Sequence, residues 1–244
     1  MGIFSKLFTK SDKAIPDGNQ ELQPKETPCK TEQELIERYG GIALDKQIDF
    51  GEIIGNNNWN VDMQQGIISF GPNLVFPIQV LGTIAHSSQT WLWAWANTMS
   101  GLPPNLIEQS LQLKKYGEDN GISLLSNHTF HFTKDKLHLL GMMASGMFHS
   151  SGYYIADYGQ GAMLVTIKDS RIDKERTENH HRILTVFPQL ISQFDMNHKN
   201  ALKSYLDAKG YSYTEKENTV TGTKNQNTLT AQFDHLARLI NLKG

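Results

Sequence analysis

The sequence predicts an α+β fold, in which an antiparallel meander packs against helices and is followed by a C-terminal helix–strands–helix unit. Apolar and polar residues alternate at strand period between residues 59 and 96, with turn residues between the segments. A helical pattern precedes this region over residues 32–54, and a helix with three strand-like segments follows residue 197. We therefore expect one α+β domain over residues 31–244, which could divide into two subunits near residues 170–182.

Length and composition limit the classes of protein to consider. The chain has 244 residues, of which 39% are hydrophobic and 20% charged, and these values are ordinary for a globular domain. Its formal net charge of -2 does not supply the basic field that general nucleic-acid binding requires. No apolar run is long enough to cross a bilayer, and no secretory signal opens the chain. We expect a cytoplasmic protein without a transmembrane segment or a nucleic-acid partner.

Residues 1–30 read as a flexible N-terminal segment and linker. Residues 1–15 are basic and amphipathic, so they could touch a membrane surface, although a frayed terminus explains them more simply. Cys29 is the lone cysteine and follows a polar stretch that contains proline. We expect it to be an exposed linker thiol rather than a catalytic one, and a single cysteine fits a reducing compartment.

The first half of the domain begins with a helix and continues as a meander. Thr31 and Glu34 have the spacing of a capping box, and Gly40-Gly41 could bend or divide the helix that follows. Pro77 lacks an N–H group, so its strand should lie at a sheet edge there or carry a bulge. The four expected strands occupy residues 59–63, 67–70, 75–84 and 89–96.

The second half alternates helices and strands. The segment 169–182 is densely charged and is expected to be solvated. Leu137–Phe148 is a buried helix whose small residues allow close packing, and Asp234 caps a last short helix. The remaining elements are a helix from Pro103 to about Gly117, a hairpin over 153–158 and 162–168, a helix capped by Asn197 and stopped by Gly210, and strands at 211–215, 219–223 and 228–233.

A tryptophan-rich strand is the most unusual segment. At strand period, Trp91, Trp93 and Trp95 share one face. The row could be an aromatic platform for a sugar, base or cation, but a central core strand is the more usual explanation. Each buried indole N–H needs an acceptor, and Gln79 is one possible partner.

Several motifs together resemble an uncharacterised bacterial family known only as a domain of unknown function. The resemblance covers roughly residues 31–120, and the pieces 194–210 and 233–239 are similar to its later part. It implies a bacterial, intracellular origin and assigns no catalytic residue. The motifs are Lys46-Gln47, Trp59-x-Val61-Asp62, Gly66-Ile67-Ile68-x-Phe70, Gln79-Val80-Leu81-Gly82 and Trp-Leu-Trp-Ala-Trp-Ala-Asn over 91–97.

A search for chemical motifs finds no catalytic residue, no phosphate loop, no dinucleotide fingerprint and no cofactor signature. No metal site is predicted, because His128 and His131 would face opposite ways on a strand and the single cysteine is badly placed. The speculative ligand-binding residues are His86, Gln79, Trp93 and Asn97, around the tryptophan strand. Asp157 and Tyr158 are weaker candidates that an exposed hairpin end explains equally well, and Asp62 is better explained as a solvated strand residue near a turn.

Two functions remain after this search. The favoured one is a non-catalytic protein-binding module, such as an antitoxin-like or immunity protein, with residues 169–182 as a docking surface. The alternative is a small-molecule-binding protein or hydrolase with a pocket beside the tryptophan strand.

Overall fold

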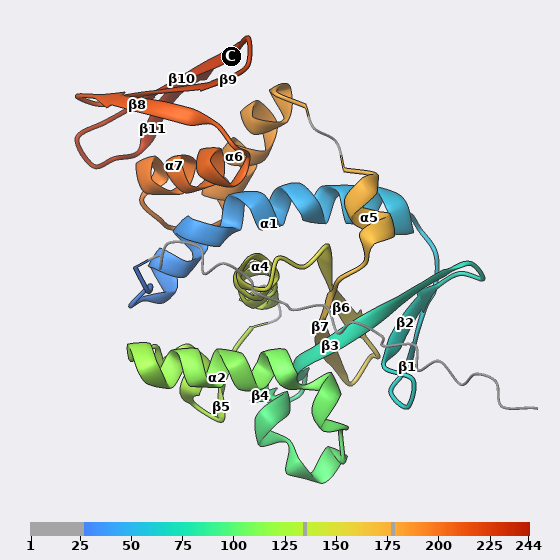
Figure 1. Ribbon diagram of the computed structural model, residues 1–244. Helices are drawn as coiled ribbons and strands as arrows, with labels where there is room; N and C mark the ends of the chain where they lie inside the picture. Colours follow the sequence, from blue (N-terminus) through green and yellow to red (C-terminus); the bar gives the residue numbers. More distant parts are fainter. Residues whose placement is uncertain (1–26, 134–135, 177–178) are drawn as a thin grey trace, which may run out of the picture.

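The computed structural model describes residues 27–133, 136–176 and 179–244. It confirms an α+β fold with two antiparallel sheets and packed helices (Figure 1). The expected membrane-surface segment 1–15 and most of the linker lie outside the described residues. None of the described helices combines the length and the apolarity that a bilayer crossing requires.

Helix α1 (Glu32–Ile54) runs through the middle of the molecule (Figure 1). Its capping box is confirmed, because the Thr31 hydroxyl accepts the N–H of Glu34 at 3.1 Å. Gly40-Gly41 does not divide it, since α1 is one continuous helix of 23 residues. These glycines instead leave room for a close neighbour, which is described below.

The seven-stranded sheet contains the predicted meander. Its strands are β1 (Trp59–Asp62), β2 (Ile67–Phe70), β3 (Leu74–Ala85), β4 (Thr90–Trp93), β5 (Thr129–His131), β6 (Gly152–Asp157) and β7 (Gly161–Ile167). The order β1-β2-β3-β4-β5 is antiparallel throughout, and the hairpin β6–β7 joins it through β3. Pairing between β3 and β7 begins at Ile78, so Pro77 has only β2 as a neighbour among the described strands. The expected edge position of Pro77 is confirmed.

The tryptophan strand is shorter than predicted. It ends at Trp93, and the 3₁₀ turn η1 (Ala94–Ala96) follows. Alanine favours helical backbone over strand, which explains the change of direction. Trp91 and Trp93 share the buried face, whereas Trp95 leaves the strand and is only half-buried.

The helices between β4 and β6 pack onto this sheet. They are α2 (Glu108–Asn120), α3 (Ser123–Ser126) and α4 (Leu137–Met147), after the short turns η2 (Thr98–Ser100) and η3 (Pro104–Leu106). The helix expected from Pro103 therefore starts later, because the prolines begin a separate 3₁₀ turn. Close packing of α4 is confirmed, since a Cβ added to Gly141 would overlap the Tyr153 ring.

Cys29 is buried, so its prediction as an exposed thiol is wrong. Its backbone N–H donates to the Tyr116 hydroxyl of α2 at 2.8 Å. The polar composition of the linker does not reveal this contact, which comes from a residue 87 positions away.

After β7 come α5 (Ser170–Lys174), which packs with the large sheet through Ile172, and then a C-terminal unit of α6 (His181–Gln193), α7 (His198–Ala208) and a sheet in the order β11-β10-β9-β8. Its strands are β8 (Ser212–Lys216), β9 (Thr219–Lys224), β10 (Asn227–Phe233) and β11 (Leu239–Lys243). The last element is thus a strand, not the expected helix. Asp234 accepts the N–H groups of Leu236 and Arg238, and this turns the chain back along β10 instead of starting a helix.

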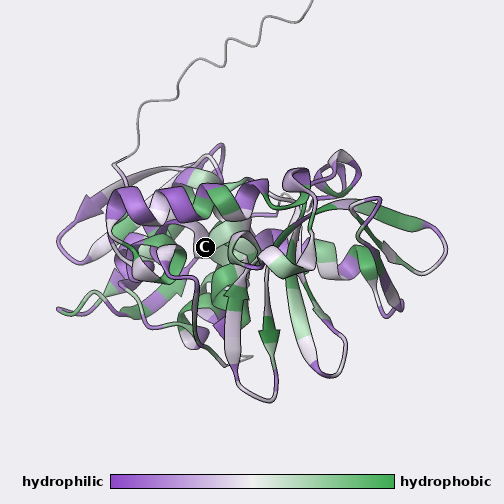
Figure 2. Cartoon of the chain, turned by 90° about the horizontal axis from the view of Figure 1, so that it is seen from below, coloured by the Kyte–Doolittle hydropathy of each residue, from purple (hydrophilic) through white to green (hydrophobic). Residues whose placement is uncertain are grey.

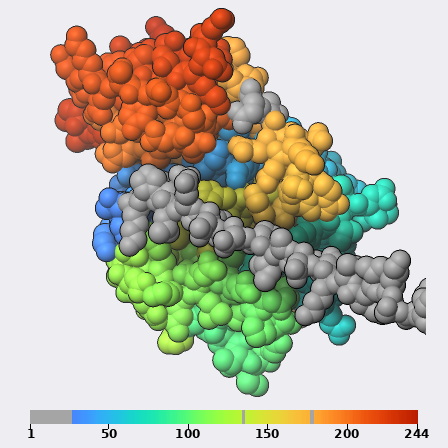
Figure 3. Space-filling model, viewed as in Figure 1, coloured from blue at the N-terminus to red at the C-terminus, as the bar shows by residue number. Residues whose placement is uncertain are grey.

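One hydrophobic cluster joins the sheet, α1, α4, α6, α7 and the inner face of β9 and β10. Green, apolar segments follow the strands in Figure 2. In Figure 3 the orange and red C-terminal residues gather at one end of the molecule, above α1. A division into two subunits near residues 170–182, where α5 lies, stays a prediction.

Candidate functional site

The four predicted ligand-binding residues have different partners in the structure. Trp93 is fully buried, and its Nε1 donates to the Leu124 carbonyl at 3.1 Å. Gln79 does not bind an indole; its Nε2 donates to the Asn105 carbonyl at 2.6 Å. Asn97 is half-buried after η1.

His86 is brought next to Asp157, another sequence candidate. Its Nε2 lies 3.1 Å from Asp157 Oδ1, and its backbone N–H donates to the Gln160 carbonyl at 3.0 Å. Asp157 Oδ1 also accepts the N–H of Gly159. These contacts attach the β6–β7 turn to the end of β3. Asp62 likewise accepts the N–H groups of the two residues after Met63, as a turn residue does.

A flat platform of three indoles does not form. The Trp91 and Trp93 rings meet edge to face, with centroids 5.3 Å apart and planes at 89°. Neither is exposed to solvent. Trp95 lies apart from this pair, with the Lys114 ammonium 4.6 Å from its ring. The two buried indoles therefore belong to the core.

The structure instead gathers charged side chains where α1 meets the C-terminal unit. Glu37, Asp45 and Asp49 lie on α1 at spacings of eight and four residues, so they share one face, and all three are buried. Gly41 lies on the same face, where its added Cβ would be 2.6 Å from the Tyr205 ring. This acidic stripe thus faces α7 at very short range.

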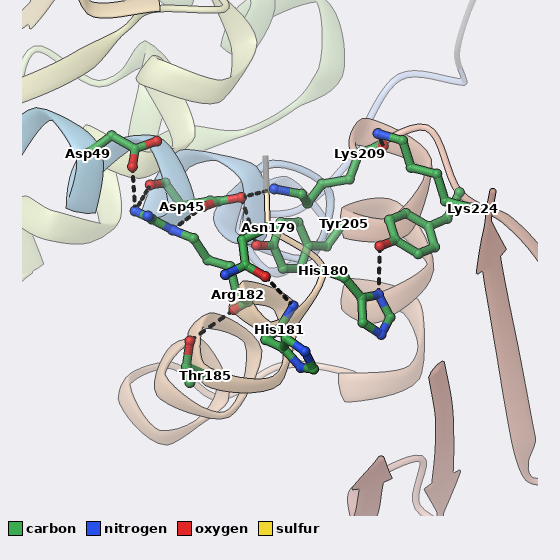
Figure 4. Close-up of polar contacts among 11 residues, drawn as sticks. Asp45, Asp49, Asn179, His180, His181, Arg182, Thr185, Tyr205, Lys209 and Lys224 are labelled. Carbon is green, nitrogen blue, oxygen red and sulfur yellow. Dashed lines mark hydrogen bonds and ion pairs between the residues drawn. The ribbon is translucent and has the colours of Figure 1, made fainter. Parts of the chain in front are cut away.

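Asp45 is the centre of a buried ion cluster, drawn in Figure 4. Its Oδ2 accepts hydrogen bonds from Lys209 Nζ at 2.6 Å and from the Tyr205 hydroxyl at 2.9 Å. Its Oδ1 lies 2.7 Å from Arg182 Nε, and a terminal nitrogen of Arg182 lies 2.7 Å from Asp49 Oδ1. Two carboxylates thus face two cations, which compensates the charges that burial removes from water.

Burial and nearby charges change the acidity of Tyr205, in this cluster, and of Lys46, next to Asp45 in the sequence. Burial first, and then the Asp45 carboxylate, raise the pKa of Tyr205, which keeps its hydroxyl a donor. On α1, burial and then the charges of Arg176 and Lys168 lower the pKa of Lys46 to about 8. The Lys46 ammonium donates to the Ser150 carbonyl at 2.9 Å.

A cleft of about 310 Å³ opens beside the cluster, at the C-terminal end of α7. His180 Nδ1 lies 2.8 Å from the Tyr211 hydroxyl, and the two rings stack with planes at 26°. Lys224 Nζ donates to the Lys209 carbonyl at 2.8 Å. The cleft is lined by Asn179, His180, Lys209, Tyr211, Lys224, Asn225 and Asn227.

This cleft can hold a ligand by hydrogen bonds and charge. Its described lining residues supply ammonium, carboxamide, imidazole and phenol groups. Across the described part of the chain, no three His, Cys, Asp or Glu side chains form a group that could hold a metal ion. A second hollow of about 330 Å³ lies on the α1 side of Asn179 and includes Arg182 and Glu52.

Comparison with known proteins identifies a family for the first part of the chain. A model described as a family of unknown function (DUF6882) matches residues 33–170, which is more than half of the sequence. The chain belongs to this family. Searches of curated proteins and of solved structures found no match. The DUF6882 match runs past the resemblance drawn over residues 31–120, and the later pieces at 194–210 and 233–239 lie outside it.

Sequence reasoning missed the cleft and the ion cluster of this DUF6882 protein. Arg182 belongs to the stretch expected to be solvated, yet its side chain is only 11% exposed. The acids on one face of α1 are a signal that could have indicated a buried partner for it. For the cleft no comparable signal exists, because residues near 179, 209 and 225 meet only through the fold.

Proposed function

We propose that the protein is a non-catalytic small-molecule-binding protein whose ligand occupies the cleft at the end of α7. The observation that supports this is the cleft itself, with about 310 Å³ of space and a lining of hydrogen-bonding groups. Ligand sites are typically concave, few in number and equipped with a small set of placed polar groups.

The walls of the cleft are held by the fold, which supports a preformed site. Lys209 and Tyr211 are each 6% exposed, so their positions are fixed by packing. Lys209 is bonded to Asp45, and Tyr211 is bonded to His180. Little ordering is needed when a ligand enters such a site, and this favours affinity.

A thermal-melting screen of polar metabolites tests the proposal. A ligand that binds only the folded state raises the melting temperature. The variant Asn227→Trp fills the cleft and should abolish the rise, whereas Gln232→Trp on the same strand, outside the cleft lining, should preserve it. A rise that persists in Asn227→Trp, or no rise with any metabolite, would overturn the proposal.

A protein-binding module, antitoxin-like or immunity protein, is the second candidate. One observation favours it: Ile240 in β11 is 66% exposed and Leu236, in the turn before β11, is 60% exposed, and β11 is at the edge of its sheet. An extended segment of a partner could add to this edge as a further strand. The docking surface expected from the sequence, residues 169–182, is less suitable because the Arg182 side chain is only 11% exposed and is paired with Asp45 and Asp49.

Co-purification with the product of a neighbouring gene tests the second candidate. Ile240→Asp should abolish the complex. Val75→Asp should leave it intact, although Val75 is also an exposed apolar residue, with 39% of its surface accessible. A complex that survives Ile240→Asp would place the contact elsewhere.

A bacterial cytoplasmic location is also part of the proposal. The resemblance and the single cysteine support it. Fractionation of a native host, with the protein found in the membrane or the periplasm, would contradict it.

A further inference from the structure

We infer that His198 makes the attachment of strand β11 to helix α7 sensitive to pH, so that a proton on its imidazole releases the start of β11 and the turn before it. The contacts between α7 and this turn produce the effect, and no ligand in the cleft is needed for it. The released segment carries the exposed side chains of Leu236 and Ile240. A change of pH would therefore alter the sheet edge at which a partner strand could add.

The imidazole of His198 accepts a hydrogen bond that only its neutral form can accept. His198 is the first residue of α7, and its Nδ1 lies 3.0 Å from the backbone nitrogen of Leu239, the first residue of β11. A backbone N–H can only donate, so Nδ1 must carry a lone pair and the ring proton must be on Nε2. In the imidazolium form both ring nitrogens are donors, and two N–H groups would then face each other across this contact.

The turn before β11 is held by a small number of contacts. The N–H of Lys199 donates to the Ala237 carbonyl at 3.3 Å, next to the His198 contact. Ala237 has a φ of 60°, in the left-handed region that alanine rarely adopts. Each of the five residues of β11 is half-buried or exposed. Loss of the His198 contact can therefore release this segment while the core beneath β9 and β10 stays closed.

The surroundings of His198 favour its neutral form at neutral pH. Burial lowers the pKa of His198 below its ordinary value of 6.5, and the charge of Arg238 lowers it further. The carboxylates of Asp195 and Asp234 oppose this shift, but Asp234 also accepts a hydrogen bond from Arg238 Nε at 2.8 Å. The attachment is therefore complete above about pH 6.5 and is lost as the pH falls through the lowered pKa.

NMR of the whole chain between about pH 7.5 and about pH 5 tests the inference. We expect the His198 ring to change from the Nε2–H tautomer to imidazolium. The hydrogen-exchange protection factor of the Leu239 amide should fall at least about tenfold over the same titration. Protection factors are compared because they remove the effect of pH on the intrinsic exchange rate. The amides that pair β9 with β10 should keep their protection.

Two variants separate His198 from the rest of this region. His198→Asn offers a carboxamide oxygen in place of Nδ1 and does not titrate, so the Leu239 amide should stay protected at both pH values. His235→Asn removes an exposed histidine of the turn before β11, and it should respond to pH as the wild type does.

Three results would overturn the inference. If the protection of Leu239 in the wild type does not change with pH, the attachment survives protonation. If His198→Asn shows the same fall as the wild type, another group is responsible. If the amides between β9 and β10 lose protection together with Leu239, the whole unit unfolds and no local release takes place.

Discussion

The ammonium of Lys209 lies 2.6 Å from a carboxylate oxygen of Asp45, which joins the end of α7 to the middle of α1 across 164 residues of sequence. Lys209 also presents its carbonyl to Lys224 at the cleft. The same residue thus belongs to the buried ion cluster and to the wall of the proposed ligand site.

Removing the charge of Asp45 should destabilise the protein strongly. Asp45→Asn leaves Arg182 and Lys209 buried with one carboxylate fewer, and breaking a buried pair costs about 3–5 kcal/mol. Urea unfolding measures this loss. Glu52→Gln, at an exposed position on the same helix, should change the free energy of unfolding by less than about 0.5 kcal/mol. A similar, small effect of both variants would show that the cluster contributes little.

Gly41→Ala should lower the free energy of unfolding by about 1–3 kcal/mol, because the new methyl overpacks the contact with α7. Its Cβ would lie 2.6 Å from Cγ and 2.7 Å from Cβ of Tyr205, atoms near the backbone that cannot turn away. Gly51 is the matched control, since nothing lies within 4 Å of its added Cβ. Gly51→Ala should raise stability by about 0.5–1 kcal/mol through helix propensity. Equal effects in chemical denaturation would contradict this picture.

Trp93→Ala should destabilise the whole protein by about 3–5 kcal/mol, since it leaves a large cavity and removes the bond to Leu124. Trp95→Ala should cost less, because Trp95 is half-buried. Ala94→Trp overpacks a buried position and should also be harmful. Thermal melting ranks the three. Trp93→Ala melting within a degree or two of wild type would contradict the burial of Trp93 in the core.

The pKa of Lys46 predicts how stability depends on pH. Burial lowers it from 10.5 to about 8 in the folded state, so the unfolded chain holds this proton more tightly. The destabilisation is complete below about pH 8 and disappears as pH rises towards 10.5, so stability increases over this window. Lys46→Met should remove this rise. Urea unfolding at about pH 7 and about pH 9.5 measures the free energy of unfolding at each pH. An equal increase between the two pH values in wild type and Lys46→Met would refute the prediction.

Local signals in the sequence were enough to predict the helices whose ends are marked by capping residues. Thr31 with Glu34 fixed the start of α1, and Asn197 with Gly210 bounded α7, since caps act through adjacent backbone groups. The same logic failed at Asp234, because an aspartate can accept nearby N–H groups either in a turn or at a helix start.

The elements and contacts that were missed depend on distant partners. Helix α6 contains Pro188 and β-branched residues, which disfavour a helix locally. It forms because Ile183, Phe187 and Leu190 bury one face in the core. The candidate site has the same origin: Lys209, Tyr211 and Lys224 are ordinary residues until the sheet and α7 bring them to His180.

The acidic stripe of α1 also affects the chain while it is being synthesised. Asp45 leaves the ribosome 137 residues before Arg182 and 164 before Lys209. At about 5–20 residues per second, that wait is on the order of ten seconds. During this time the side of α1 that carries Asp45 has not yet met α6 and α7. Its carboxylates keep that side hydrated, whereas an apolar stripe would promote aggregation. The charges that the finished protein must neutralise therefore protect the unfinished one.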